Sequence, residues 1–159
     1  MRSQVQLFVA IVAWSVTESG SAVADPALIV NSTAGRAGDL VELTVDYQAE
    51  GNVVAFDFEL KYDPKRLTAG PVISAAIAPH TASASVLSPG ILKVVVPVVL
   101  ENPLPVVETA MPLITVPFLV SARADPGVAP VTLTNVVLAD VNGEAVTATI
   151  LSGGIAIQP

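Results

Sequence analysis

The stretch FDFELKYDPKRL, residues 56–67, decides the fold of this chain. Its first seven residues alternate between an apolar set and a charged set, the apolar set being Phe56, Phe58, Leu60 and Tyr62 and the charged set Asp57, Glu59 and Lys61. Successive side chains of a strand point to opposite faces, so each set occupies a face of its own. The Asp63-Pro64 pair then ends the strand in a turn. We predict a half-buried strand with rings in a core and carboxylates facing water or a partner.

The rest of the chain repeats this pattern of short apolar runs between breakers. Residues 41–47 and 114–120 alternate in the same way, and 13 Pro and 10 Gly punctuate the whole sequence. Further runs rich in β-branched residues predict strands at 28–31, 72–77, 83–87, 91–100, 131–139, 145–151 and 154–157. No stretch shows a helical period. Many strands without helices between them predict an all-β fold, a sandwich of two sheets.

Two connections follow from turn chemistry. Val141-Asn142-Gly143-Glu144 predicts a hairpin with a type I′ turn between the eighth and ninth strands, because both central residues of that turn need positive φ. The same segment with Asp140 superficially resembles the start of a calcium loop, but it lacks the later bidentate Glu and a following helix. Residues 102–112 are rich in Pro, which cannot donate to a strand ladder, so they predict a surface connection.

The first 24 residues predict a secretory signal peptide. Arg2 supplies a positive start, residues 5–14 are mostly apolar, and Ala22-Val23-Ala24 offers a cleavage site of small residues. The apolar run is shorter than the about 20 residues that a membrane helix needs. We therefore expect residues 25–159 to form a single domain, secreted or periplasmic, with no membrane insertion after cleavage.

Composition argues against several classes of function. The chain has no Cys, which rules out disulfides and thiolate metal sites, and its net charge of −7 argues against nucleic acid and anionic membranes. His80 is the single His, so any nucleophilic triad would depend on this one residue in a Pro-containing loop. No spacing of carboxylates singles out a catalytic pair. We predict no enzyme, no cofactor and no metal site.

Several segments, in their order, resemble cohesin domains, the exported receptor modules that capture dockerin domains in bacterial polysaccharide-degrading assemblies. They are residues 56–67, Gly38 with the strand at 41–47, LITVPFLV at 113–120, and the closing part from Asp125-Pro126-Gly127 to 153–157. The resemblance covers residues 28–157. It implies a jelly-roll sandwich of about nine strands, an architecture shared with carbohydrate-binding modules, whose exposed sheet face grips a helical dockerin.

The resemblance also implies roles for particular carboxylates. Asp57 stands where many cohesins have an acid that hydrogen-bonds to the dockerin, and Glu101 stands where the family often has another acidic contact. Glu59 shares the outward face of Asp57 by strand alternation. Ala55 departs from the family pattern, in which a polar residue, commonly Asn, precedes the acid by two positions. This departure implies a weaker or differently specific contact.

The strand predicted at 91–100 adds an apolar stripe to this face. If its even-numbered residues point inward, then Val95, Pro97 and Val99 point outward between Lys93 and Glu101. An apolar stripe with charged ends is typical of a recognition surface. The alternative is that this strand is buried on both faces or covered by residues 102–112. We therefore predict a partner-binding site that comprises Asp57, Glu59, Val95, Val99 and Glu101.

Two other classes of function remain open. A carbohydrate-binding module shares this architecture, but sugar platforms rely on exposed aromatic rings. Trp14 lies in the signal peptide, and the aromatic residues of the mature chain, Tyr47, Phe56, Phe58, Tyr62 and Phe118, all fall on inward faces. Polysaccharide binding through hydrogen bonds alone would be weak. A structural or adhesion subunit that assembles by a donated strand is the other class, and its strands would not be interrupted by Pro.

Overall fold

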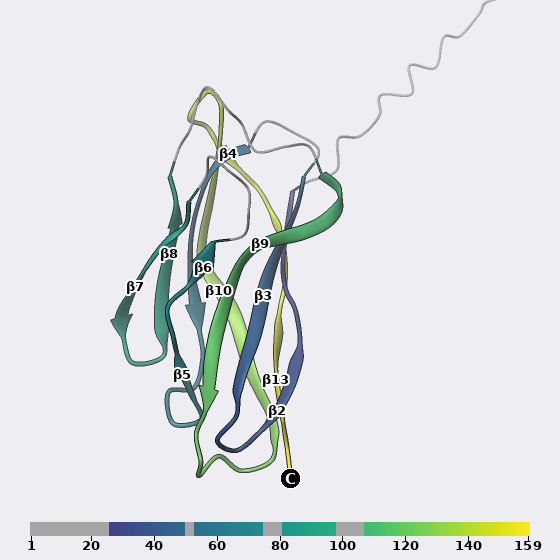
Figure 1. The fold of residues 1–159 in the computed structure, drawn as a ribbon. Coiled ribbons are helices and arrows are strands. Elements are labelled where there is room, and N and C mark those ends of the chain that lie inside the picture. Colours follow the sequence, from purple (N-terminus) through teal and green to yellow (C-terminus); the bar gives the residue numbers. More distant parts are fainter. Residues whose placement is uncertain (1–25, 50–52, 75–80, 98–106) are drawn as a thin grey trace, which may run out of the picture.

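The computed structural model describes residues 26–49, 53–74, 81–97 and 107–159. All regular structure in these ranges is β, arranged as a six-stranded and a seven-stranded sheet packed face to face (Figure 1). The prediction of an all-β, two-sheet sandwich is confirmed. The strands outnumber the expected nine because several short edge strands add to the main ones.

The six-stranded sheet has the order β12-β1-β3-β9-β5, and β6 also pairs with β9. Its strands are β1 (Ala27–Val30), β3 (Leu40–Ala49), β5 (Leu67–Ala69), β6 (Ile73–Ser74), β9 (Val107–Val120) and β12 (Thr149–Leu151). The long antiparallel pair β3 and β9 forms its middle, with Leu43 opposite Val116 and Val45 opposite Ile114. All four of these side chains are buried.

The seven-stranded sheet has the order β2-β13-β10-β4-β8-β7, and β11 also pairs with β10. Its strands are β2 (Thr33–Arg36), β4 (Val53–Lys61), β7 (Ser83–Ser88), β8 (Ile91–Val96), β10 (Gly127–Asp140), β11 (Ala145–Val146) and β13 (Gly153–Gln158). The strand predicted from residues 56–62 is β4, which lies between β10 and β8. Its neighbours on both sides are antiparallel.

Aromatic rings fill the space between the two sheets, as strand alternation predicts. Tyr47 meets Phe56 edge to face with 5.0 Å between ring centroids, and Tyr62 meets Phe118 in the same way at 5.1 Å. Phe58 is fully buried, while Tyr62 is half-buried at the end of β4. Burying such a ring contributes about 1.5–3 kcal/mol, so the inward face of β4 is a main source of stability.

The strand predicted at residues 145–151 is two strands in different sheets. β11 pairs with β10 in the seven-stranded sheet, whereas β12 pairs with β1 in the other. Alternation did not reveal β2 and β5, which have only four and three residues. Conversely, the Pro-rich connection predicted at 102–112 is wrong for its second half, because β9 already begins at Val107. Pro112 lies beside a register shift in the ladder to β3, where a missing N–H is tolerated.

The hairpin at Asn142-Gly143 joins β10 to β11, but the prediction of a type I′ turn is wrong. Gly143 has a φ of 79°, whereas Asn135 is the sole non-glycine residue with positive φ in the described ranges. The turn starts one residue earlier, with the Gly143 N–H donating to the carbonyl of Asp140 at 3.0 Å.

The Asp140 carboxylate accepts the N–H groups of Asn142 and Glu144 at 2.8 and 3.0 Å. These bonds hold the pKa of Asp140 below its usual value, with the Glu144 N–H as the largest cause. The side chain therefore serves the turn.

Candidate functional site

The outward face of β10, β4, β8 and β7 arranges its side chains in rows, because directly opposed residues in antiparallel strands point to the same face. One row consists of Val137, Asp57, Val95 and Ser83, taken in strand order. The next row consists of Thr134, Glu59, Lys93 and Ser85. Both acids thus lie on β4, with two paired strands beyond it on one side and β10 on the other.

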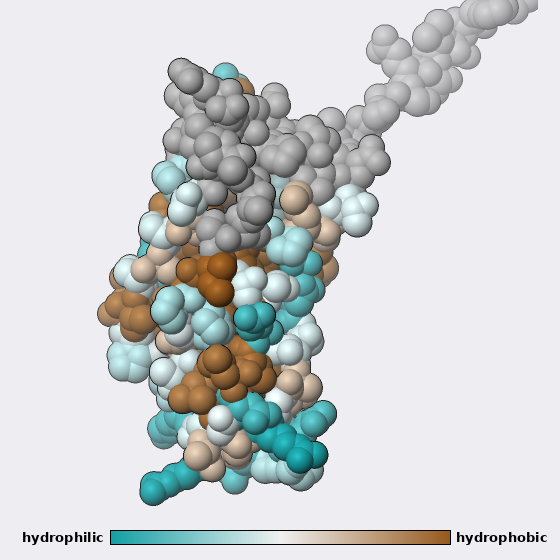
Figure 2. All heavy atoms as spheres, viewed as in Figure 1, coloured by the Kyte–Doolittle hydropathy of each residue, from teal (hydrophilic) through white to brown (hydrophobic). Residues whose placement is uncertain are grey.

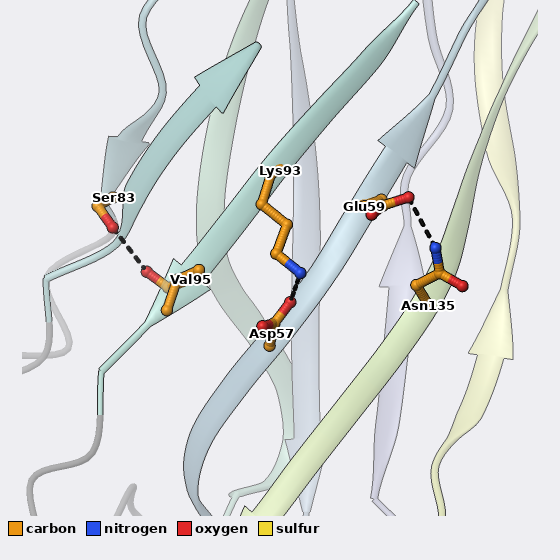
Figure 3. Close-up of polar contacts among 6 residues, drawn as sticks. All are labelled: Asp57, Glu59, Ser83, Lys93, Val95 and Asn135. Carbon is orange, nitrogen blue, oxygen red and sulfur yellow. Dashed lines mark hydrogen bonds and ion pairs between the residues drawn. The ribbon is translucent and has the colours of Figure 1, made fainter. Parts of the chain in front are cut away.

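Asp57 forms an ion pair with Lys93, which lies diagonally opposite on β8 (Figure 3). The side chains are 40% and 28% exposed, respectively, so water screens the attraction between them. Pairs of this kind contribute about 0–1 kcal/mol to stability. Lys93 contacts Oδ1 of the carboxylate, which is buried and has no hydrogen-bond partner among the described residues besides this ion pair. Because Oδ1 is buried while the side chain is 40% exposed, Oδ2 is the oxygen that can accept a hydrogen bond from outside.

Glu59 accepts a hydrogen bond from the side-chain amide of Asn135 at 2.9 Å (Figure 3). Asn135 has a φ of 50°, in the left-handed region that Asn tolerates better than most residues. It lies within a register shift of the β10–β4 ladder, between Thr134 and Val137. Between the pairs that these two residues form, β10 has two residues, Asn135 and Val136, whereas β4 has one, Phe58, as in a β-bulge.

The bulge places Val137 on the outward face. Unbroken alternation from Val131 would turn Asn135 and Val137 into the core, yet Val137 is 54% exposed and Leu138 is 1% exposed. Val137 therefore lies beside Asp57, a position that strand alternation did not reveal. The available signal was the polar Asn135 at a position that simple alternation assigns to the core.

The structure brings Asp57, Glu59 and Val95 onto one face, as the sequence predicts. Val99 and Glu101 lie outside the described residues. On β8 the inward residues Leu92, Val94 and Val96 are at most 3% exposed. Val95 is half-buried and Pro97 is exposed, so β8 is not buried on both faces. The Ser83 hydroxyl donates to the carbonyl of Val95 at 3.4 Å, which joins β7 to this row (Figure 3).

Small residues occupy the end of this face next to β11. Ala139 lies opposite both Ala55 on β4 and Ala145 on β11. None of the three side chains extends beyond Cβ. A partner backbone can therefore approach this end of the sheet more closely than it could approach a row of long side chains.

Other kinds of site find little support in the described ranges. No group of three His, Cys, Asp or Glu residues there could hold a metal ion, and His80 lies outside those ranges. One pocket of about 330 Å³ lies beside the bulge, lined by Val136, Ala145, Val146, Thr147, Ala148 and Ile150, none of which is an acid or a base. No helix in the part of the chain that the structure describes is long and apolar enough to cross a membrane.

Comparison with known proteins agrees with the fold. The family model of the cohesin domain matches residues 26–157. The cohesin–dockerin complex Coh-OlpA–Doc918 from Clostridium thermocellum contains a similar chain, with 20% identity, a TM-score of 0.75, and coverage of 85% of this chain and 100% of that one. The non-cellulosomal cohesin from the hyperthermophilic archaeon Archaeoglobus fulgidus shows 18% identity, a TM-score of 0.72, and coverage of 86% and 93%. At these identities the likeness shows the fold. No curated protein matches the chain.

Proposed function

Because the chain belongs to the cohesin domain family, we propose that it is a non-catalytic recognition module that binds a dockerin-type protein on the outward face of β10, β4, β8 and β7. The observation that supports this face is the row in which Asp57 lies between Val137 and Val95. The signal pattern of residues 1–24 supports a place outside the cytoplasm. We infer a role there in extracellular polysaccharide degradation, the setting that the family resemblance suggests.

The row combines an acceptor with apolar flanks, which is what a helix surface requires for docking. Oδ2 of Asp57 would accept a hydrogen bond from an N–H or O–H group of the partner. Val137 and Val95 would bury against apolar side chains on either side of that bond and exclude water from it. Lys93 pairs with the charge of Asp57, whereas the neutral amide of Asn135 donates to Glu59 without cancelling its charge, so the face presents acceptors and keeps a negative charge at Glu59.

The test is calorimetric titration of the chain with a purified dockerin-bearing protein from the same organism. Val137→Glu places a charge in the proposed contact and should weaken binding at least about tenfold, or about 1.4 kcal/mol. Leu119→Glu is the matched control, since Leu119 is 47% exposed on the outward face of the other sheet. Equal loss of affinity in both variants, or in neither, would contradict the assignment of the face.

The aromatic residues count against the main alternative, a carbohydrate-binding module. Tyr47, Phe56, Phe58 and Phe118 are at most 1% exposed, and Tyr62 is half-buried against Phe118. No aromatic platform for a sugar ring therefore exists among the described residues. Retention of the chain on insoluble polysaccharide would favour this alternative nevertheless. Polymers that grow with concentration would favour the other one, a structural or adhesion subunit.

A further inference from the structure

Two register shifts in the ladder between β10 and β4 cancel each other. At the bulge β10 gains one residue over β4, and between Ala139 and Asp140 β4 gains one residue, Val54, over β10. Residues 137–139 are therefore displaced by one position, whereas the ladder on either side of them keeps one common register. We propose that Asn135 selects this displaced register and thereby determines which side chains β10 presents to a partner. This role in recognition rests on the proposed function of the face, whereas the register itself is measurable without a partner.

A straight ladder is the alternative to the displaced register. Without the two shifts, the residues of both strands would pair one to one, with Asn135 opposite Phe58. Phe58 is fully buried between the sheets, and directly opposed residues point to the same face, so Asn135 would enter the core. Val137 would enter it as well, while Val136 and Leu138 would turn outward, because a slip of one residue reverses the face of every side chain in the segment.

The side chain of Asn135 disfavours this straight ladder. In the observed structure its amide is exposed and donates to Glu59 at 2.9 Å (Figure 3). In the core the amide would lose both this bond and water, and burying a polar group without such partners is costly. The backbone of Asn135 also adopts the φ of 50° that the bulge requires, a conformation that Asn tolerates better than β-branched residues do. Side chain and backbone therefore both favour the displaced register.

The apolar residues of the segment distinguish the two registers less sharply. The displaced register buries Leu138, which is 1% exposed, but it leaves Val137 54% exposed. The straight ladder would exchange them, so the loss of one buried side chain would be partly offset by the gain of another. An exposed Leu is also tolerated elsewhere, because Leu40 and Leu119 are 70% and 47% exposed, and hydrophobic patches are visible on the face shown in Figure 2. The polar Asn135 is consequently the residue that decides the register.

The register controls the size of one residue at the small end of the face. In the displaced register Ala139 lies opposite Ala55, whereas in the straight ladder Leu138 would take its place. The Asp57 row would keep a valine, because Val136 would replace the valine that lies there now. The two registers therefore offer a partner the same acceptor and flank but a different surface beside them. A partner backbone that approaches the small end closely fits only the displaced register.

Substitutions at residue 135 can separate the two registers. Asn135→Val should convert the segment to the straight ladder, because Val gains burial in the core and disfavours a positive φ. Asn135→Gly is the matched control, since it loses the same hydrogen bond to Glu59 but adopts positive φ without steric cost. It should keep the displaced register. Adding Leu138→Ala to Asn135→Val removes the side chain that the straight ladder exposes, so this double variant should adopt the straight ladder even if Asn135→Val alone folds poorly.

Because the chain has no Cys, engineered cysteine pairs can report the register directly. Ala55→Cys with Ala139→Cys places two thiols opposite each other in the displaced register, where paired Cα atoms lie within disulfide range. Mild oxidation should close this disulfide in the wild-type and Asn135→Gly backgrounds, but not in either background that carries Asn135→Val. Lys61→Cys with Thr132→Cys is the control pair and should close in every background, since these residues are opposite each other in both registers. Closure of the first pair in all backgrounds, or in none, would overturn the proposal.

Binding adds a functional readout to the measured register. Calorimetry with the dockerin-bearing protein should show that Asn135→Val binds at least about tenfold more weakly than Asn135→Gly, because Leu138 then crowds the small end. Adding Leu138→Ala should restore the affinity, since an alanine again lies opposite Ala55. Equal affinities of the two single variants, or no recovery in the double variant, would contradict the role of the register in recognition. Absence of binding by the wild type would contradict the proposed function instead, and the disulfide pairs would still decide the register.

Discussion

Among single residues, Tyr47 has a buried hydroxyl whose loss of contact with water no hydrogen bond compensates. Its side chain is fully buried, and its hydroxyl has no hydrogen-bond partner in the described part of the chain. Burial raises the pKa of Tyr47 from 10.0 to about 12. Leaving a buried polar group unpaired costs about 1–3 kcal/mol. The ring is retained for its packing on Phe56, which does not need the hydroxyl.

Tyr47→Phe should therefore be at least as stable as the wild type at neutral pH, by up to about 1 kcal/mol. The pKa shift adds a pH dependence. Between pH 10 and about pH 12 the folded chain keeps the Tyr47 proton that the unfolded chain releases, so stability falls as pH rises through this range. The variant should lack this part of the loss, on the order of 1–3 kcal/mol. Urea unfolding at neutral and alkaline pH measures both effects. A variant clearly less stable at neutral pH would mean that the hydroxyl has a partner.

Asp57 should matter for binding and little for folding. Asp57→Ala removes the acceptor beside Val95 and Val137, and we expect a loss of about 1–3 kcal/mol in affinity for a dockerin-type partner. The ion pair with Lys93 is partly exposed, so the free energy of unfolding should change by less than about 1 kcal/mol. Calorimetry and urea unfolding of the same preparation separate the two quantities. Glu42→Ala, an exposed acid on the opposite sheet, is the control for net charge. Unchanged affinity in Asp57→Ala would remove this residue from the site.

Among the elements, the bulge in β10 connects backbone conformation to the composition of the face. In Asn135→Gly the new residue adopts the positive φ at no steric cost. In Asn135→Ala the same backbone conformation costs about 1–2 kcal/mol, because the Cβ of Ala clashes with the backbone there. Both variants lose the hydrogen bond to Glu59. We therefore expect the Ala variant to be less stable than the Gly variant by about 1 kcal/mol, measured by urea unfolding. Equal stability of the two would show that the backbone at residue 135 can relax out of its positive φ.

The same bulge shows where prediction from sequence ends. Alternation located β3, β4 and β8 and the inward aromatic rings, because one buried face imposes a period of two on the sequence. It did not reveal that Val137 faces outward, because an inserted residue changes the parity of every position after it. It missed β2, whose four residues pair parallel with β13. Such pairing depends on partners distant in the sequence. The prediction of a type I′ turn was wrong for a local reason: the Asp140 carboxylate accepts the N–H groups of Asn142 and Glu144 and so favours a different turn.

For the whole molecule, hydrogen bonds from Arg66 link two connections between the sheets at one end of the sandwich. The guanidinium donates to the carbonyls of Val128 and Asp125 at 2.8 Å each and of Gly127 at 3.1 Å. Arg66 lies in the connection from β4 to β5, and the accepting carbonyls lie at the start of β10 and in the connection that leads to it from β9. Both connections pass from one sheet to the other. The Ser121 N–H also donates to the carbonyl of Arg66 at 2.8 Å, so the two crossovers are joined by backbone as well.

Arg66→Ala should consequently destabilise the sandwich as a whole by about 1–3 kcal/mol, because three carbonyls lose a charged donor and two crossovers lose a shared contact. Arg66→Lys should recover only part of this loss, since an ammonium group cannot reproduce the planar fork that reaches several carbonyls at once. Urea unfolding gives the free energies, and Lys65→Ala, an exposed neighbour of like charge, controls for the change in net charge. Full recovery by Lys would show that charge alone is sufficient at this end. Partner affinity should persist in Arg66→Ala, because the Asp57 row is built by β10, β4, β8 and β7 without any contact to Arg66 in the described structure.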